Sequence, residues 1–171
     1  MFEVILFVVL AAIAVVTALL VILQRNPVAS AIFLILTFFC LAGIYLLLNA
    51  PFIAVMQLLV YAGAIMVLFL FVIMLLNLEK EQKIMTRSRL QKIFAVFLGI
   101  VLLIQIGMTF HSVLVTGEKG AFPADKVAAL GNTEVVARLL FTEFLLPFEI
   151  TSVLLLAAIV GAILLAKREI E

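Results

Sequence analysis

Long runs of apolar residues, separated by short polar segments, make up most of this sequence. A helix that crosses the hydrocarbon core of a membrane needs roughly 17–25 mostly apolar residues. Runs of this length occupy residues 4–23, 28–48, 52–76, 93–115 and 144–166. The pattern therefore predicts an all-α integral membrane protein with five transmembrane helices, folded as a single membrane domain over residues 1–171.

The segments between these runs predict how the helices are connected. Asn26-Pro27 and Asn49-Ala50-Pro51 form the first two connections, and both place a proline where the next helix begins, a position that tolerates its missing N–H. Such short connections force the first three spans to run antiparallel as neighbours. The third connection is a charged loop at 77–92. The fourth is a long loop at 116–143, in which Asn132 is expected to begin a short helix along the membrane surface.

Basic residues are distributed unevenly between the two ends of the predicted spans. One side collects eight of them, namely Arg25, Lys80, Lys83, Arg87, Arg89, Lys92, Lys167 and Arg168. The other side collects Lys119, Lys126 and Arg138. Because cytoplasmic loops carry the excess of Lys and Arg, this distribution predicts an N-terminus outside and a cytoplasmic C-terminus, with the charged loop inside and the long loop outside.

Composition excludes several classes of function. The chain is 68% hydrophobic and 12% charged, whereas a soluble domain is about 45–50% apolar and about 25% charged. A net charge of +1 gives no indication of a nucleic-acid partner. The single Cys40 and the single His111 cannot hold an iron–sulfur cluster or a paired-histidine haem, and Cys40 is expected to be a buried thiol. Motifs for nucleotides, flavins or metals are absent from the sequence, so we expect no catalytic, cofactor-binding or metal-binding residue in this chain.

Polar groups inside the third run are candidates for function, because their burial in hydrocarbon is costly. Tyr61 lies near the middle of this run, and Gln57 precedes it by one helical turn, so we expect both side chains on one face. Gly63 lets a neighbouring backbone approach or the helix deform, and Met66 follows within one turn. Two roles stay open for Tyr61: a structural hydrogen bond to a neighbouring helix, or the organisation of waters in a proton path.

The residue types Asp, Glu, Lys, Arg and His are absent from the middle of the second, third and fourth runs, which argues against a self-contained channel or carrier. Glu149, one to two turns into the fifth run, is the exception. Its carboxylate either reaches water at the membrane surface, or lines a hydrated path or pairs with another subunit. Apolar residues on nearly all sides of the predicted helices indicate a subunit surrounded by other helices as well as lipid.

Three segments are distinctive as sequences: Asn-Pro-Val-Ala-Ser-Ala at 26–31, Val-Tyr-Ala-Gly-Ala-Ile-Met-Val-Leu-Phe at 60–69, and Leu-Phe-Thr-Glu-Phe-Leu-Leu-Pro-Phe-Glu at 140–149. The second segment resembles the third-helix motif of subunit J of the proton-pumping NADH-quinone oxidoreductase (respiratory complex I), called subunit 6 in mitochondria. The other two resemble that family's first turn and its entry to the fifth helix, where a glutamate matching Glu149 recurs.

The resemblance implies a membrane-arm subunit that helps couple electron transfer from NADH to quinone with proton translocation. The chain would then act in an enzyme as a subunit, without a catalytic centre of its own. The implied partners are the quinone-site subunit, subunit K and other membrane-arm subunits, in the lipid of a bacterial inner membrane whose outer side is the periplasm. FMN and iron–sulfur clusters are expected in partner subunits, and quinone mainly in a neighbouring subunit.

The resemblance also implies a role for the third helix. In the family this helix can hold a π-bulge, here around Tyr61 to Met66, and it is thought to rotate between two states that open and close a water path. The candidates for gating and for the proton path are then Tyr61, Gly63, Met66, Gln57 and Glu149. Two alternatives remain: an equivalent subunit of a related cation/proton antiporter or membrane-bound hydrogenase complex, and a purely structural membrane subunit.

Overall fold

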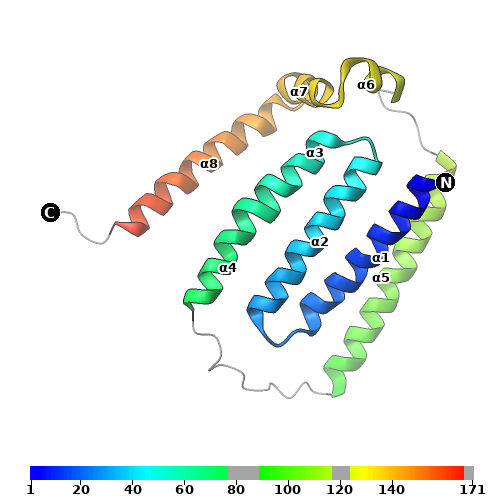
Figure 1. Ribbon diagram of the computed structural model, residues 1–171, viewed down its shortest axis with the longest axis vertical. Coiled ribbons are helices and arrows are strands. Elements are labelled where there is room, and N and C mark those ends of the chain that lie inside the picture. The colour runs from blue at the N-terminus through cyan, green and yellow to red at the C-terminus, as the bar shows by residue number, and fades with distance from the viewer. Residues whose placement is uncertain (77–88, 117–123, 168–171) are drawn as a thin grey trace.

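The computed structural model describes residues 1–76, 89–116 and 124–167, and every regular element in these ranges is a helix (Figure 1). The helices are α1 Phe2–Leu23, α2 Pro27–Leu47, α3 Pro51–Met56, η1 Gln57–Ile65, α4 Met66–Leu75, α5 Arg89–Thr116, α6 Ala124–Leu130, α7 Asn132–Thr142 and α8 Leu145–Ala166. Because α3, η1 and α4 follow one another without a break, they form one continuous helix. Most of the charged loop predicted at 77–92 lies outside the described residues.

Four helices within the described ranges are long and apolar enough to cross a membrane. They are Phe2–Leu23, Pro27–Leu47, Pro51–Leu75 and Leu145–Ala166. These helices match the first, second, third and fifth predicted spans, whereas the fourth falls in α5, whose apolar stretch is the shorter Ile93–Thr109. The prediction of a multi-pass, all-α membrane protein is confirmed, and the count of five spans and their orientation stay predictions.

Local sequence explains where the second and third membrane helices begin. The Asn26 side-chain oxygen accepts a hydrogen bond from the Val28 N–H at 2.9 Å, a group that has no partner inside the helix. Pro27 takes the first helical position. The next turn uses Asn49 at φ 56°, a left-handed conformation that asparagine tolerates, before Pro51 starts α3. As predicted, these turns place α1, α2 and α3–α4 side by side in alternating directions (Figure 1).

Small residues and one polar pair dominate the buried part of α1 and α2. The buried residues of the two helices are Ala14, Thr17, Ala31, Thr37, Cys40 and Ala42, so Cys40 is a buried thiol as predicted. The hydroxyls of Thr17 and Thr37 are hydrogen-bonded to each other at 2.8 Å. A hydrogen bond between helices in a membrane contributes about 0.6 kcal/mol on average and up to about 1–2 kcal/mol, and this one ties α1 to α2.

The last membrane helix extends away from the layer formed by α1, α2 and α3–α4 (Figure 1). No residue of α8 is buried, and the helix packs against α7, where the rings of Phe141 and Phe148 meet edge to face with centroids 5.0 Å apart. The helix α7 begins at Asn132, as the sequence predicts, and also packs against α3. In a membrane, the exposed apolar side of α8 is covered by lipid or by helices of other subunits.

Candidate functional site

The third membrane helix departs from α-helical geometry over nine residues. In this segment, η1, the backbone hydrogen bonds follow the π pattern and span five residues instead of four. At its end, the Met66 N–H donates toward the carbonyl oxygens of Gly63 and Tyr61, and the helix returns to α geometry. The resemblance places the bulge around Tyr61 to Met66. The observed π segment begins at Gln57, four residues before Tyr61, and ends at Ile65. Because π segments are rare and are found frequently at functional sites, η1 is the principal candidate site.

The π segment shifts the buried face of this helix by one residue. The buried residues of α3, η1 and α4 are Ala54, Gln57, Ala62 and Met66, and none is more than 8% exposed. Since an α-helix repeats about every 3.6 residues, a regular helix would follow Gln57 with Tyr61 on this face. The observed step from Gln57 to Ala62 is five residues, which is the π spacing. Ala62 therefore occupies the buried position that α-helical periodicity assigns to Tyr61.

Gly63 fits the π segment because it has no side chain. A Cβ placed on Gly63 would lie 3.1 Å from the carbonyl oxygen of Leu58, the residue five positions earlier. This separation is tighter than an ordinary carbon–oxygen contact, and the opposing atom belongs to the helix backbone and cannot rotate away. Among the other helical glycines in the described part of the chain, a Cβ on Gly43 would lie 2.9 Å from the end of the flexible Leu10 side chain. A Cβ on Gly99, Gly107 or Gly161 would meet nothing within 4 Å beyond the adjacent turn of its own helix.

The two polar side chains of η1 lie in different surroundings. Gln57 is 8% exposed, whereas Tyr61 is 49% exposed, so the expectation that they share one face is wrong in this state. The π spacing is the physical reason, because it rotates Tyr61 past the position that an α-helix would give it. The Tyr61 ring packs edge to face against Phe38 of α2, with centroids 5.9 Å apart. Met66, the remaining candidate on this helix, is 3% exposed and serves as buried packing.

The structure does not place Glu149 near the other candidate residues. It lies near the start of α8 on an exposed face, and α8 stands apart from α3–α4 (Figure 1). Arg138 and Glu134 form an ion pair at 2.7 Å on α7. The described residues also contain no group of three or more His, Cys, Asp or Glu side chains placed to hold a metal ion.

Sequence reasoning missed two residues that the structure makes relevant. Ala62 carries no chemical signal, and its importance follows from the buried position that it takes from Tyr61. Asn132 was expected to begin a helix, but its side-chain oxygen also accepts a hydrogen bond from the Phe52 N–H at 3.3 Å. A sequence pattern cannot indicate this link, because the two residues are 80 positions apart.

The fold and the site define a class of protein: a multi-pass, all-α membrane protein whose third membrane helix holds a π segment. The model of the family NADH-ubiquinone/plastoquinone oxidoreductase chain 6 matches residues 17–165 of this chain. The chain belongs to that family. Membership confirms the resemblance and, with it, the prediction of a membrane subunit of an oxidoreductase of the complex I type.

Individual relatives agree with this assignment. NAD(P)H-quinone oxidoreductase chain 6 of Nostoc sp. is 39% identical over 167 residues, covering 98% of this chain and 80% of the relative. NADH-quinone oxidoreductase subunit J of Rhodobacter capsulatus is 34% identical over 166 residues, covering 95% and 80%. F(420)H(2) dehydrogenase subunit J of Methanosarcina mazei is 36% identical over 162 residues, covering 94% and 88%. The similarity extends along almost the whole chain, including η1.

Proposed function

We propose that η1 is a conformational gate of a water path for protons, in a chain that serves as the subunit J counterpart of a proton-translocating NADH:quinone oxidoreductase. The observation that carries this proposal is the five-residue step from Gln57 to Ala62 on the buried face of the third membrane helix. An α-helical step would be four residues instead of five. This helix therefore has a second register available, the α register, while it stays packed against α2. The two registers provide the open and closed states of the gate.

The second register follows from helix geometry. If η1 adopts α geometry, the part of the helix after it turns by about 100°, the angle of one residue. Tyr61 and Ile65 then face α2, and Ala62 and Met66 turn outward. In both registers the backbone hydrogen bonds run within the helix, as hydrocarbon requires, and the two registers differ in pairing only where η1 meets its α-helical flanks.

The exchange replaces the Ala62 methyl group by the Tyr61 phenol at the buried position of this helix, and Tyr61 moves inward from the half-exposed place where its ring meets Phe38. A phenol both donates and accepts hydrogen bonds without ionising, and the Gln57 amide does the same. Tyr61 and Gln57 together organise water at this contact in the α register, whereas Ala62 leaves an apolar contact in the π register. Occupancy of a quinone site in a neighbouring subunit biases the equilibrium, because a ligand shifts two states by its difference in affinity for them.

The remainder of the machinery lies in partner subunits. The exposed apolar side of α8 supports contact with other membrane-arm subunits, including the quinone-site subunit and subunit K. Glu149, exposed on that helix, extends the hydrated path or pairs with a partner side chain. FMN and iron–sulfur clusters belong to partner subunits, quinone to a neighbouring one, and the complex to a bacterial inner membrane with the N-terminus of this chain in the periplasm.

The partner subunits, and not this chain, determine which electron donor the complex uses. The relative from Methanosarcina mazei is named as a subunit of an F(420)H(2) dehydrogenase, so a chain of this family also occurs with a donor other than NADH. Isolation of the complex from native membranes in mild detergent decides the point. NADH:ferricyanide activity and flavin-containing partners are the expected result, while antiporter-type or hydrogenase-type partners without that activity would contradict the NADH assignment.

Deletion of a single residue from η1 tests the gate. Removing Leu59, which is 63% exposed, shortens the step from Gln57 to Ala62 to four residues and makes the helix α-helical without changing which residues face α2. We expect the complex to assemble and to oxidise NADH with ferricyanide, but to lose proton pumping coupled to quinone reduction. Normal pumping by the assembled deletion variant would overturn the gate. Removing Leu103 of α5, also strongly exposed, is the matched control for the loss of one residue.

A further inference from the structure

The start of the third membrane helix is capped by a residue from another element. Pro51 has no N–H, and Ala50, which precedes it, has no side-chain acceptor for a helix cap. The Phe52 N–H is therefore among the groups at the start of a helix that lack an intrahelical partner. The side-chain oxygen of Asn132, the first residue of α7, accepts its hydrogen bond at 3.3 Å. Asn132, from another element, thus caps the third membrane helix, which the side chain of Ala50 cannot do.

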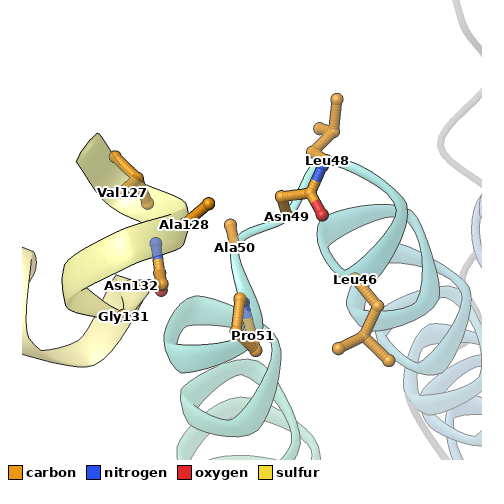
Figure 2. A pocket seen from close by; sticks show the side chains of 9 residues that line it. All are labelled: Leu46, Leu48, Asn49, Ala50, Pro51, Val127, Ala128, Gly131 and Asn132. Carbon is orange, nitrogen blue, oxygen red and sulfur yellow. The ribbon is translucent and has the colours of Figure 1, made fainter. Parts of the chain in front are cut away.

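The helix that supplies this cap is itself anchored. Gly131, at φ 90°, makes the turn from α6 into α7, and Val135 is buried one turn later. On the outer face of α7, Glu134 and Arg138 form an exposed ion pair. Figure 2 shows the α6–α7 junction facing the α2–α3 turn across a hollow of about 770 Å³ lined in part by Asn132. The hydrogen bond from Phe52 is thus a polar link between two segments that a hollow otherwise separates.

The two halves of the helix are held unequally. The half before η1 has the Asn132 cap, packs against both α2 and α7, and buries Ala54 at 2% exposure. The half after η1 is α4, which also packs against α2 and buries Met66 but makes no comparable contact with α7 in the described structure. A change of register in η1 must turn one half relative to the other, and the less strongly held half is α4.

We propose that Asn132 is a positioning residue that holds α3 stationary, so that the change of register in η1 turns α4 alone. This proposal rests on the proposed function, because it assigns a fixed side and a moving side to the gate. Without the cap, part of the turn is taken up by α3, and α4 turns through a smaller angle. Asn132 touches neither the water path nor any reacting group, and it acts on the gate through the backbone of Phe52.

Distances between spin labels test this assignment in the intact, purified complex. Labels are attached through ketone-bearing residues incorporated in place of Ile53 on α3 or Val67 on α4, both exposed, so native cysteines stay untouched. The reference label replaces Leu19 on α1, which the Thr17–Thr37 hydrogen bond ties to α2. Distances are measured in the oxidised complex with and without a quinone-site inhibitor. A residue turned by about 100° on a helix about 10–12 Å across moves by roughly 8 Å.

The expected result is a shift of several ångströms at position 67 and none at position 53 in the otherwise native chain. Asn132→Ala is expected to reduce the shift at 67 and to produce one at 53. Asn132→Asp keeps an acceptor oxygen for the Phe52 N–H and is expected to restore the native pattern. If the role of Asn132 is purely structural, Asn132→Ala will lower the amount of assembled complex without reducing the shift at position 67 or producing one at position 53.

The contrary outcomes are distinguishable. If position 67 shifts in the native chain and Asn132→Ala leaves both positions unchanged, the positioning role is wrong and the gate stands. If position 53 already shifts in the native chain, α3 is not the stationary side. If neither position shifts in any state, the gate itself is wrong, and the role of Asn132 is wrong with it.

Discussion

Replacing Gly63 with alanine is the sharpest perturbation of η1. The new Cβ would lie 3.1 Å from the Leu58 carbonyl oxygen, so the two atoms must separate by a few tenths of an ångström. In a helix this separation bends backbone angles, and a bend of about 7° costs about 1 kcal/mol. The contact joins residues five positions apart, which is the spacing of the π register. Gly63→Ala therefore disfavours the π register by about 1 kcal/mol, which changes the ratio of the two registers roughly fivefold.

The assay compares proton pumping per electron with NADH:ferricyanide activity in the purified complex after reconstitution into vesicles. We expect Gly63→Ala to reduce coupled pumping by up to roughly fivefold, with assembly and ferricyanide activity unchanged. Gly107→Ala is the matched control, because a Cβ at that glycine would meet nothing within 4 Å beyond the adjacent turn of its own helix. If the two variants pump equally, the π register of η1 has no part in coupling and the reasoning is refuted.

Three further substitutions give separate outcomes. Tyr61→Phe keeps the ring contact with Phe38 but removes the hydroxyl, so coupled pumping should fall while the amount of assembled complex stays the same; unchanged pumping would assign Tyr61 to packing. Thr37→Val breaks the hydrogen bond to Thr17 and should destabilise the subunit by about 0.6–2 kcal/mol, seen as faster thermal inactivation with an unchanged pumping ratio. Glu149→Gln should lower pumping, whereas Glu143→Gln, at the end of α7 before α8 begins, should not. Equal effects would place Glu149 at the membrane surface.

The sequence predicts the parts of this fold that depend on local interactions. Asn26 marks a helix start because its short polar side chain accepts a hydrogen bond from an amide group two residues away. Asn132 begins α7 as predicted, although its side chain does not cap that helix. The contact between Asn132 and Phe52 depends on how distant segments meet, so no local pattern indicates it. The sequence also does not predict that α8 extends away from the other membrane helices. Apolar residues on all sides of a helix are compatible both with lipid and with neighbouring helices.

The candidate site could be predicted only in outline. Gly63 indicates that the helix is able to deform, but an α and a π turn use the same residues, and the choice between them depends on packing against α2. Tyr61 and Gln57 were therefore placed on one face by α-helical periodicity, whereas the five-residue step separates them. Ala62, which takes the buried position, is chemically indistinguishable from other alanines in the membrane helices.

Atomic structures of the intact complex in two states, oxidised at rest and trapped during turnover, test the central claim most directly. The account predicts one state with Ala62 and Met66 facing α2, as described above, and another with η1 in α geometry and Tyr61 and Ile65 facing α2. Identical registers of this helix in both states would contradict the account and leave η1 as a fixed structural feature.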